Sequence, residues 1–141
     1  MKQLDFTVEI NASKEKVWDI LWQDESYRAW TSVFIPGSYY DGELKEGNEI
    51  LFLSPGKHGL FAVVEKVFPY QSMHFMHFGL VLDGIAQAKT FPDDAIEYYD
   101  LYESETGTKL SVTLKCDPEY LTYFSNSFPR ALNAVKELAE K

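Results

Sequence analysis

Residues 37–114 contain a long succession of short strand-type segments. GSYYDGEL, NEILFLS, GLFAVVEKV and QSMHFMHF are rich in aromatic and β-branched residues, and the turn sequences KEG, PGKHG and FPY separate them. Strand-type runs that alternate with short turns are typical of consecutive β-hairpins. After an interruption at residues 79–95, which we interpret as a longer loop or lip, IEYYDLYE, the turn SETG and TKLSVTLK predict a last hairpin. The pattern predicts an antiparallel meander.

The N-terminal region adds one strand and two short helices. Apolar residues alternate with others in the first ten residues, at Leu4, Phe6, Val8 and Ile10, which is the period of a half-buried strand. With this strand the sheet has about seven strands. Ser13 offers an N-cap for a helix with an unusually wide apolar arc, and QDESYRAW predicts a second short helix that ends near Trp30.

A long helix is expected at the C-terminus. Asp117 is suited to cap it and Pro118 to open its first turn. From Leu121 to Leu138 apolar residues recur at spacings of three and four, and this register continues through Pro129. Proline lacks the N–H that would bind the carbonyl four residues earlier, so we predict one kinked helix rather than two.

Length and charge limit the classes of function. The 141 residues suit a single domain, 1–141. Thirteen basic and twenty-two acidic residues give a net charge of −9, which argues against binding to nucleic acid or to anionic membranes. No segment approaches the ~18 apolar residues of a membrane span, and Asp5 and Glu9 interrupt the N-terminal apolar run. We therefore expect a cytoplasmic protein without a membrane span.

Neither a metal site nor a cofactor is expected. His74 and His77 are three residues apart in a strand and therefore point to opposite faces, while His58 lies in a turn. The single cysteine, Cys116, excludes an intramolecular disulfide and zinc sites built on several thiolates. It precedes a helix N-terminus, where the macrodipole lowers a thiol pKa, but no Cys-His-Asp motif surrounds it. We expect a buried, unreactive thiol.

The order of elements and three motifs resemble a known family. INASKEKVWDIL, YRAW and DLYESETGTKLSVTLK, in which Gly107 and Thr108 start the last strand, are similar to the SRPBCC superfamily, also called START-like or birch-pollen-allergen-like. Within it, the likeness is greatest to homologues of the heat-shock chaperone ATPase activator. The resemblance implies an α+β helix-grip fold, in which a curved antiparallel sheet wraps around the C-terminal helix and leaves a cavity. Its members include lipid carriers, polyketide cyclases, stress proteins and chaperone cofactors.

The resemblance also implies roles for the three tryptophans. Trp18 and Trp22 are expected to pack in the core, in a helix that closes one end of the grip, whereas Trp30 is expected near the cavity mouth.

Two registers are open for the strand at 96–103. Either Glu97 and Tyr99 face inward with Leu101, or Ile96, Tyr98, Asp100 and Tyr102 do. The resemblance favours the first register, because it places an inward leucine at Leu101. A carboxylate beside apolar walls has a raised pKa and can act as a general acid or base, although a hydrogen bond that merely satisfies Glu97 is the simpler interpretation.

Three functions follow from these expectations. The first is binding of a small apolar or aromatic molecule in the cavity, with His77 and Glu97 as orienting polar groups. The second is a cyclase, dehydratase or hydrolase that uses Glu97 or His77 in the same cavity. The third is a protein cofactor that stimulates a chaperone ATPase through its acidic surface. The predicted cavity wall consists of Trp30, Phe34, Phe52, Phe61, Phe75, His77, Glu97, Tyr99, Phe124 and Phe128.

Overall fold

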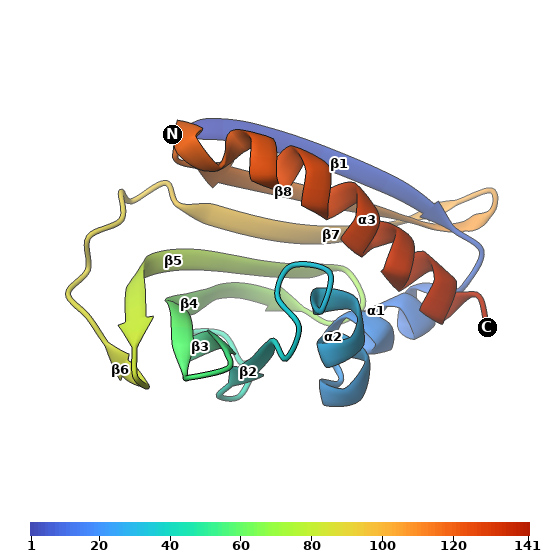
Figure 1. The fold of residues 1–141 in the computed structure, drawn as a ribbon. Coiled ribbons are helices and arrows are strands. Elements are labelled where there is room, and N and C mark those ends of the chain that lie inside the picture. The colour runs from blue at the N-terminus through green and yellow to red at the C-terminus, as the bar shows by residue number, and fades with distance from the viewer.

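One curved antiparallel sheet and one long helix dominate the computed structural model, which describes residues 1–141 (Figure 1). The helices are α1 (Lys14–Trp22), α2 (Asp24–Thr31), the 3-10 turn η1 (Pro118–Tyr120) and α3 (Leu121–Ala139). The strands are β1 (Lys2–Ile10), β2 (Tyr39–Asp41), β3 (Glu49–Ser54), β4 (His58–Phe68), β5 (Ser72–Leu82), β6 (Ile85–Ala86), β7 (Ile96–Ser104) and β8 (Gly107–Cys116).

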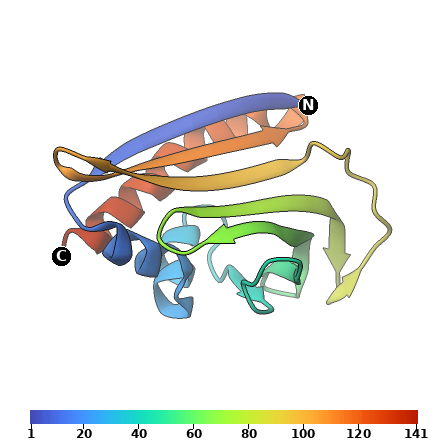
Figure 2. The same cartoon turned by 180° about the vertical axis from the view of Figure 1, so that it is seen from behind.

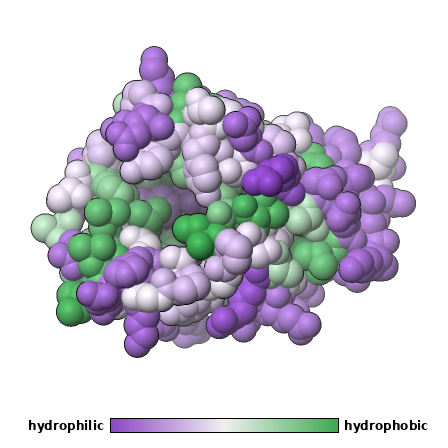
Figure 3. Space-filling view, viewed as in Figure 1, coloured by the Kyte–Doolittle hydropathy of each residue, from purple (hydrophilic) through white to green (hydrophobic).

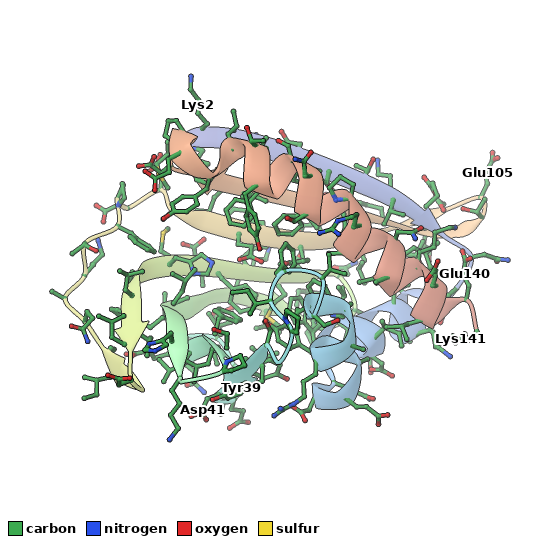
Figure 4. The ribbon with its side chains drawn as sticks, viewed as in Figure 1. Lys2, Tyr39, Asp41, Glu105, Glu140 and Lys141 are labelled. Carbon is green, nitrogen blue, oxygen red and sulfur yellow. The ribbon has the colours of Figure 1, made fainter.

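The sheet is open, with strand order β1-β8-β7-β5-β4-β3-β2 and β6 paired to β5. Helix α3 runs across its concave side, and α1 and α2 lie at one end, as the two opposite views show (Figures 1 and 2). The charged side chains of Lys2, Glu105 and Lys141 project from the periphery (Figure 4). This arrangement confirms the predicted α+β helix-grip fold.

The predicted helix starts and the single C-terminal helix are confirmed. The Ser13 hydroxyl accepts a hydrogen bond from the Lys16 amide, and the Asp117 carboxylate accepts one from the Glu119 amide. Pro129 lies inside α3 without dividing it, because the apolar positions on both sides of it pack against the same sheet.

The interruption predicted at 79–95 is shorter in the structure. β5 continues to Leu82 and forms a hairpin with the two-residue strand β6, so the sheet has eight strands rather than seven. Asp83 and Gly84, between the two strands, both have positive φ angles, of 53° and 79°. An Asp-Gly pair in that conformation forms the tight turn that suits the twist of a hairpin. Apart from this turn, residues 87–95 are the part of the segment that lies outside regular structure.

The expected roles of Trp18 and Trp30 are wrong. Trp30 is only 1% exposed, and its Nε1–H donates to the Leu21 carbonyl at 3.1 Å. Leu21 lies in the last turn of α1, where carbonyls lack a partner within the helix, so the indole satisfies a group that would otherwise be orphaned. Trp18 is half-buried, packs edge-on against Tyr70, and lines a small surface hollow of about 340 Å³.

The core lies between the concave side of the sheet and the helices. It is one cluster of 22 buried residues, to which β1, β5, β7, β8, α1, α2 and α3 all contribute. No helix combines the length and the apolar character that crossing a membrane requires.

Candidate ligand-binding cavity

A cavity of about 620 Å³ lies beside the core, between α3, α2 and the inner side of β3, β4, β5 and β7. Figure 3 shows the hollow between α3 and the strands opposite, with hydrophobic residues on either side of the opening. Five lining residues are large, apolar and exposed: Met1, Ile35, Leu80, Tyr120 and Tyr123. The cavity is therefore open to solvent through an apolar rim.

Eight of the ten predicted wall residues line this cavity. They are Trp30, Phe34, Phe52, His77, Glu97, Tyr99, Phe124 and Phe128. They come from α2, the segment that follows it, β3, β5, β7 and α3, so residues nearly 100 positions apart in the sequence share one wall.

Phe75 lies behind the wall rather than in it. It is 1% exposed, and its ring packs edge-on against Phe52 at 5.0 Å and Trp22 at 5.6 Å between ring centroids. Phe75 supports the lining residue Phe52 from the core side.

Phe61 lies on the other face of the sheet, contrary to expectation. It packs with Leu53 and Val81 in a second, smaller cluster. The register between β4 and β5 shifts between Phe61 and Ala62, where a bulge inserts Phe78 on β5. The alternation of β4 stays regular, so Phe61 faces outward between the inward residues Leu60 and Ala62. On β5 the inserted residue changes the alternation, so beyond it Leu80 lines the cavity.

A continuous series of aromatic rings connects the interior of the cavity with its rim. Tyr99 contacts Trp30 at 6.2 Å between centroids, Trp30 contacts Phe34 at 6.5 Å, and Phe34 contacts Phe128 at 4.9 Å. Phe128 in turn contacts Phe124 at 5.8 Å. Most of these pairs meet edge to face, which is a favourable arrangement for aromatic rings.

The inner wall carries one carboxylate with two hydrogen-bond partners. Glu97, Tyr99 and Leu101 share the inward face of β7, which is the register that the resemblance favoured. Nε2 of His77 lies 2.8 Å from Oε1 of Glu97, and the Tyr99 hydroxyl donates to Oε2. The β5–β7 register pairs Phe75 with Glu97, so His77, two residues further on, is the diagonal neighbour of Glu97 on the same face.

The three groups shift each other's protonation. Burial alone raises the pKa of the Glu97 carboxyl, but the hydrogen bond and electrostatic attraction of the His77 ring, together with the Tyr99 hydrogen bond, lower it below its ordinary value. Burial, the charge of Glu97 and the hydrogen bond to it hold the pKa of Tyr99 well above its ordinary value. Burial and the charge of Glu97 also raise the pKa of Tyr27. The favoured state is a carboxylate beside neutral phenols.

Access to these groups is uneven. The Glu97 side chain keeps 25% of its surface accessible although it lies on the inner wall, so this surface faces the cavity. The His77 side chain keeps 10%, and its Nδ1 atom is buried without a hydrogen-bond partner. Glu97 is therefore the more exposed of the two groups to a bound molecule.

The other two histidines lie outside this group. His74 is on the opposite face of β5 from His77, as predicted, where its Nε2 lies 2.9 Å from Asp100 and its ring stacks on Tyr98 at 3.9 Å. His58 is the first residue of β4, where it contributes to the cavity lining and is half exposed. No group of three or more His, Cys, Asp or Glu side chains converges in a way that could hold a metal ion.

Cys116 is 6% exposed and contributes to the lining near the rim. Burial and the neighbouring charge of Asp117 raise the pKa of its thiol, and the N-terminal amino group opposes this only in part. The helix terminus does not activate it, because burial and the negative charge of Asp117 both oppose ionisation of the thiol.

Sequence reasoning missed several lining residues. Tyr27 is 7% exposed and touches Trp30 at 5.5 Å. The sequence could have indicated Tyr27, because it lies three residues before Trp30 in α2 and residues at that spacing share one face of a helix. Leu60, Leu80 and Leu114 have no such signal, because only the strand pairing and its bulge show which way they face.

Comparisons with known proteins show the fold. No family model matches the sequence, and neither does any curated protein. Among solved structures, the Aha1 dimer from Colwellia psychrerythraea is similar with a TM-score of 0.74 at 19% identity, covering 99% of this chain and 97% of that one. Protein MLL2253 from Mesorhizobium loti is similar with a TM-score of 0.71 at 17% identity, covering 97% of this chain and 96% of that one.

A third similar structure is DynU16, a protein of the dynemicin biosynthetic locus, with a TM-score of 0.75 at 11% identity. It covers 100% of this chain, which spans 48% of that longer chain. At these identities the likeness concerns the arrangement of strands and helices, and it supports the helix-grip architecture of this protein.

Proposed function

We propose that this protein binds a small apolar or aromatic molecule in the cavity between the sheet and α3. The observation that carries the proposal is the cavity itself, about 620 Å³ in volume, with a continuous aromatic wall from Tyr99 to Phe124. Protein interiors are normally close-packed, and ligand sites typically occupy ~300–1,000 Å³ with apolar walls and a few polar groups. The single inner carboxylate, with His77 and Tyr99, fits that description.

The distribution of exposed apolar residues supports binding in the cavity over docking elsewhere. Five of the ten large exposed apolar residues line the cavity: Met1, Ile35, Leu80, Tyr120 and Tyr123. A cofactor of a chaperone ATPase would need a surface outside the cavity, whereas half of these exposed apolar residues belong to the cavity lining.

The test is a thermal-shift screen with fatty acids, flavonoids, sterols, aromatic polyketides and aromatic amines. A ligand that binds only the folded protein stabilises it by RT ln(1 + [L]/Kd), about 2.7 kcal/mol at a hundredfold excess over Kd, which raises the Tm of a domain this size by several degrees. Native mass spectrometry of protein purified from its own host would search for the natural ligand.

A pair of variants shows whether a hit occupies the cavity. Phe124→Ala removes a half-buried ring from the wall and should weaken binding about tenfold or more, since a buried aromatic surface is lost from the contact. Phe68→Ala, which removes a ring that is 55% exposed and lies outside the cavity, should leave binding unchanged. Equal effects of both variants, or no Tm shift with any compound class, would contradict the proposal.

The second candidate is an enzyme of cyclase, dehydratase or hydrolase type. The observation in its favour is the Glu97 carboxylate at 2.8 Å from His77, with the Tyr99 hydroxyl on its other oxygen, on the wall of an open cavity. A carboxylate held beside a proton donor can act as a general base. If the natural ligand changes mass on incubation with the wild type but not with Glu97→Gln, the protein is an enzyme; an unchanged ligand makes it a binder.

A further inference from the structure

We propose that the cavity selects ligands that carry a protonated amine, held against the Glu97 carboxylate, and rejects ligands with an anionic head group. This inference rests on the proposed function and names the ligand class for the same site. Four observations support it: the free hydrogen-bond capacity of Glu97, the neutral partners of its carboxylate, the positions of nearby cations and the aromatic rings around it.

Glu97 keeps unused acceptor capacity that faces the cavity. Each of its oxygens has one protein partner, His77 on Oε1 and Tyr99 on Oε2. An ionised carboxylate offers about four acceptor sites. Since 25% of the side-chain surface is open to the cavity, a bound molecule can reach the remaining sites. What the site lacks is a further donor, and a ligand can supply it.

The hydrogen-bond geometry around Glu97 favours neutral partners on both of its oxygens. The Tyr99 hydroxyl is neutral. Nδ1 of His77 is buried and unpartnered, so a doubly protonated ring would leave a buried N–H without an acceptor. The neutral tautomer with its proton on Nε2 satisfies the geometry instead, and it donates to Oε1 without neutralising it.

The nearest basic side chain along the strands, Lys115, is paired with Asp94 rather than with Glu97. Leu114 pairs with Glu97 across β7 and β8 and is 4% exposed on the inner side. The next residue, Lys115, also contributes to the cavity lining, and its Nζ lies 3.7 Å from the Asp94 carboxylate. The cations on the cavity lining are thus Lys115, beside Asp94, and the Met1 amino group, which acts on Cys116, whereas the hydrogen-bond partners of Glu97 are His77 and Tyr99.

The aromatic surroundings strengthen the preference for a cation. Tyr99 and Trp30 contact each other beside the carboxylate, and the Phe52 ring lies 5.7 Å from His77. The faces of aromatic rings attract cations, while their apolar bodies accommodate the rest of the ligand. An anionic head group would instead meet an uncompensated like charge in a poorly solvated site. The structure therefore ranks head groups as amine, then hydroxyl, then carboxylate.

The experiment uses three probes that share one apolar body: 2-naphthylmethylamine, 2-naphthylmethanol and 2-naphthoate. Dissociation constants are measured by calorimetry at neutral pH, at low and at high ionic strength. High salt screens the net charge of −9, which by itself would attract any cation to the surface. The amine should bind at least about tenfold more tightly than the alcohol, and the carboxylate most weakly, at both ionic strengths.

Two matched variants separate the site from the overall charge. Glu97→Gln should abolish the preference for the amine, while Glu105→Gln, which removes the same charge from an exposed turn far from the cavity, should retain it. If Glu97→Gln fails to fold, the ranking measured on the wild type still decides the question.

The outcomes distinguish this inference from the proposed function. Equal affinities for the three probes, or tightest binding of the carboxylate, would overturn the amine preference while leaving cavity binding intact. A preference for the amine that disappears at high salt would also overturn it, since surface charge alone would then explain the ranking. Failure of all three probes to bind, together with a negative thermal-shift screen, would overturn both proposals.

Discussion

Nε2 of His77 and Oε1 of Glu97 lie 2.8 Å apart although 20 residues separate them in the chain. The two side chains meet because β5 and β7 are adjacent and antiparallel, with Phe75 opposite Glu97. This pair makes the inner wall of an otherwise aromatic cavity polar.

Replacement of Trp30 by alanine should be far more damaging than replacement of Trp18. Trp30 is 1% exposed and its indole N–H binds the Leu21 carbonyl, so truncation leaves a cavity and an unsatisfied carbonyl. We expect a loss of about 3–5 kcal/mol for Trp30→Ala and less than about 2 kcal/mol for the half-buried Trp18. Urea denaturation of both variants measures this, and equal losses would contradict the assignment.

Acid should remove a stabilising contribution of Glu97. The folded-state pKa of Glu97 lies below its ordinary value of 4.5, so its contribution is complete above pH 4.5 and is lost as the pH falls through the lower, folded value. The difference in unfolding free energy between wild type and Glu97→Gln should therefore shrink over that acid range. Glu105→Gln serves as the control. A difference that stays constant down to about pH 3 would show that Glu97 is not stabilised as an anion.

Alkali should destabilise the protein through its buried tyrosines. The pKa values of Tyr27 and Tyr99 are raised by burial and by the charge of Glu97, so the folded state favours the neutral phenols. Their contribution is complete below the ordinary tyrosine pKa of 10.0 and decreases as the pH rises above it. Phenolate absorbance of these residues should appear together with unfolding.

Tyr27→Phe should shift that alkaline transition to higher pH, whereas Tyr102→Phe, at a position that is 52% exposed, should not. Titration of Tyr27 and Tyr99 in a protein that remains folded would contradict the prediction.

Replacement of Pro129 by alanine should stabilise the protein. Pro129 is exposed in the middle of α3 and has no N–H for the Ser125 carbonyl. Alanine restores that donor, and we expect a gain of about 1–3 kcal/mol, reduced in part by the greater freedom of the unfolded chain. Asn133→Ala, an exposed position one turn later, should change stability by less than about 0.5 kcal/mol. A loss of stability in Pro129→Ala would mean that the helix needs the proline to place Phe128 and Leu132 against the sheet.

Local pattern alone predicted much of the architecture. A regular backbone repeats its side-chain directions at a constant period. Alternation from Leu4 to Ile10 therefore indicates the buried face of β1, and the spacing of three and four from Leu121 to Leu138 indicates that of α3. The caps at Ser13 and Asp117 are equally local, since each involves a residue within three positions. The Asp83–Gly84 pair within 79–95 is an equally local signal, because Asp-Gly favours a tight hairpin turn.

The sequence by itself determined the order of elements, the antiparallel sheet and the aromatic composition of most of the wall. Only the tertiary structure decided which aromatic rings line the cavity and which lie behind or opposite it. Trp30 is buried because a free carbonyl at the end of α1 lies within reach of its indole. Phe61 faces outward because it pairs with Leu51 of β3, while the next pair, Ala62 and Ile50, takes the inward side. His77 meets Glu97 only through the register of two strands. Each of these outcomes depends on pairing between segments distant in the chain, and the period of a single segment contains no information about that pairing.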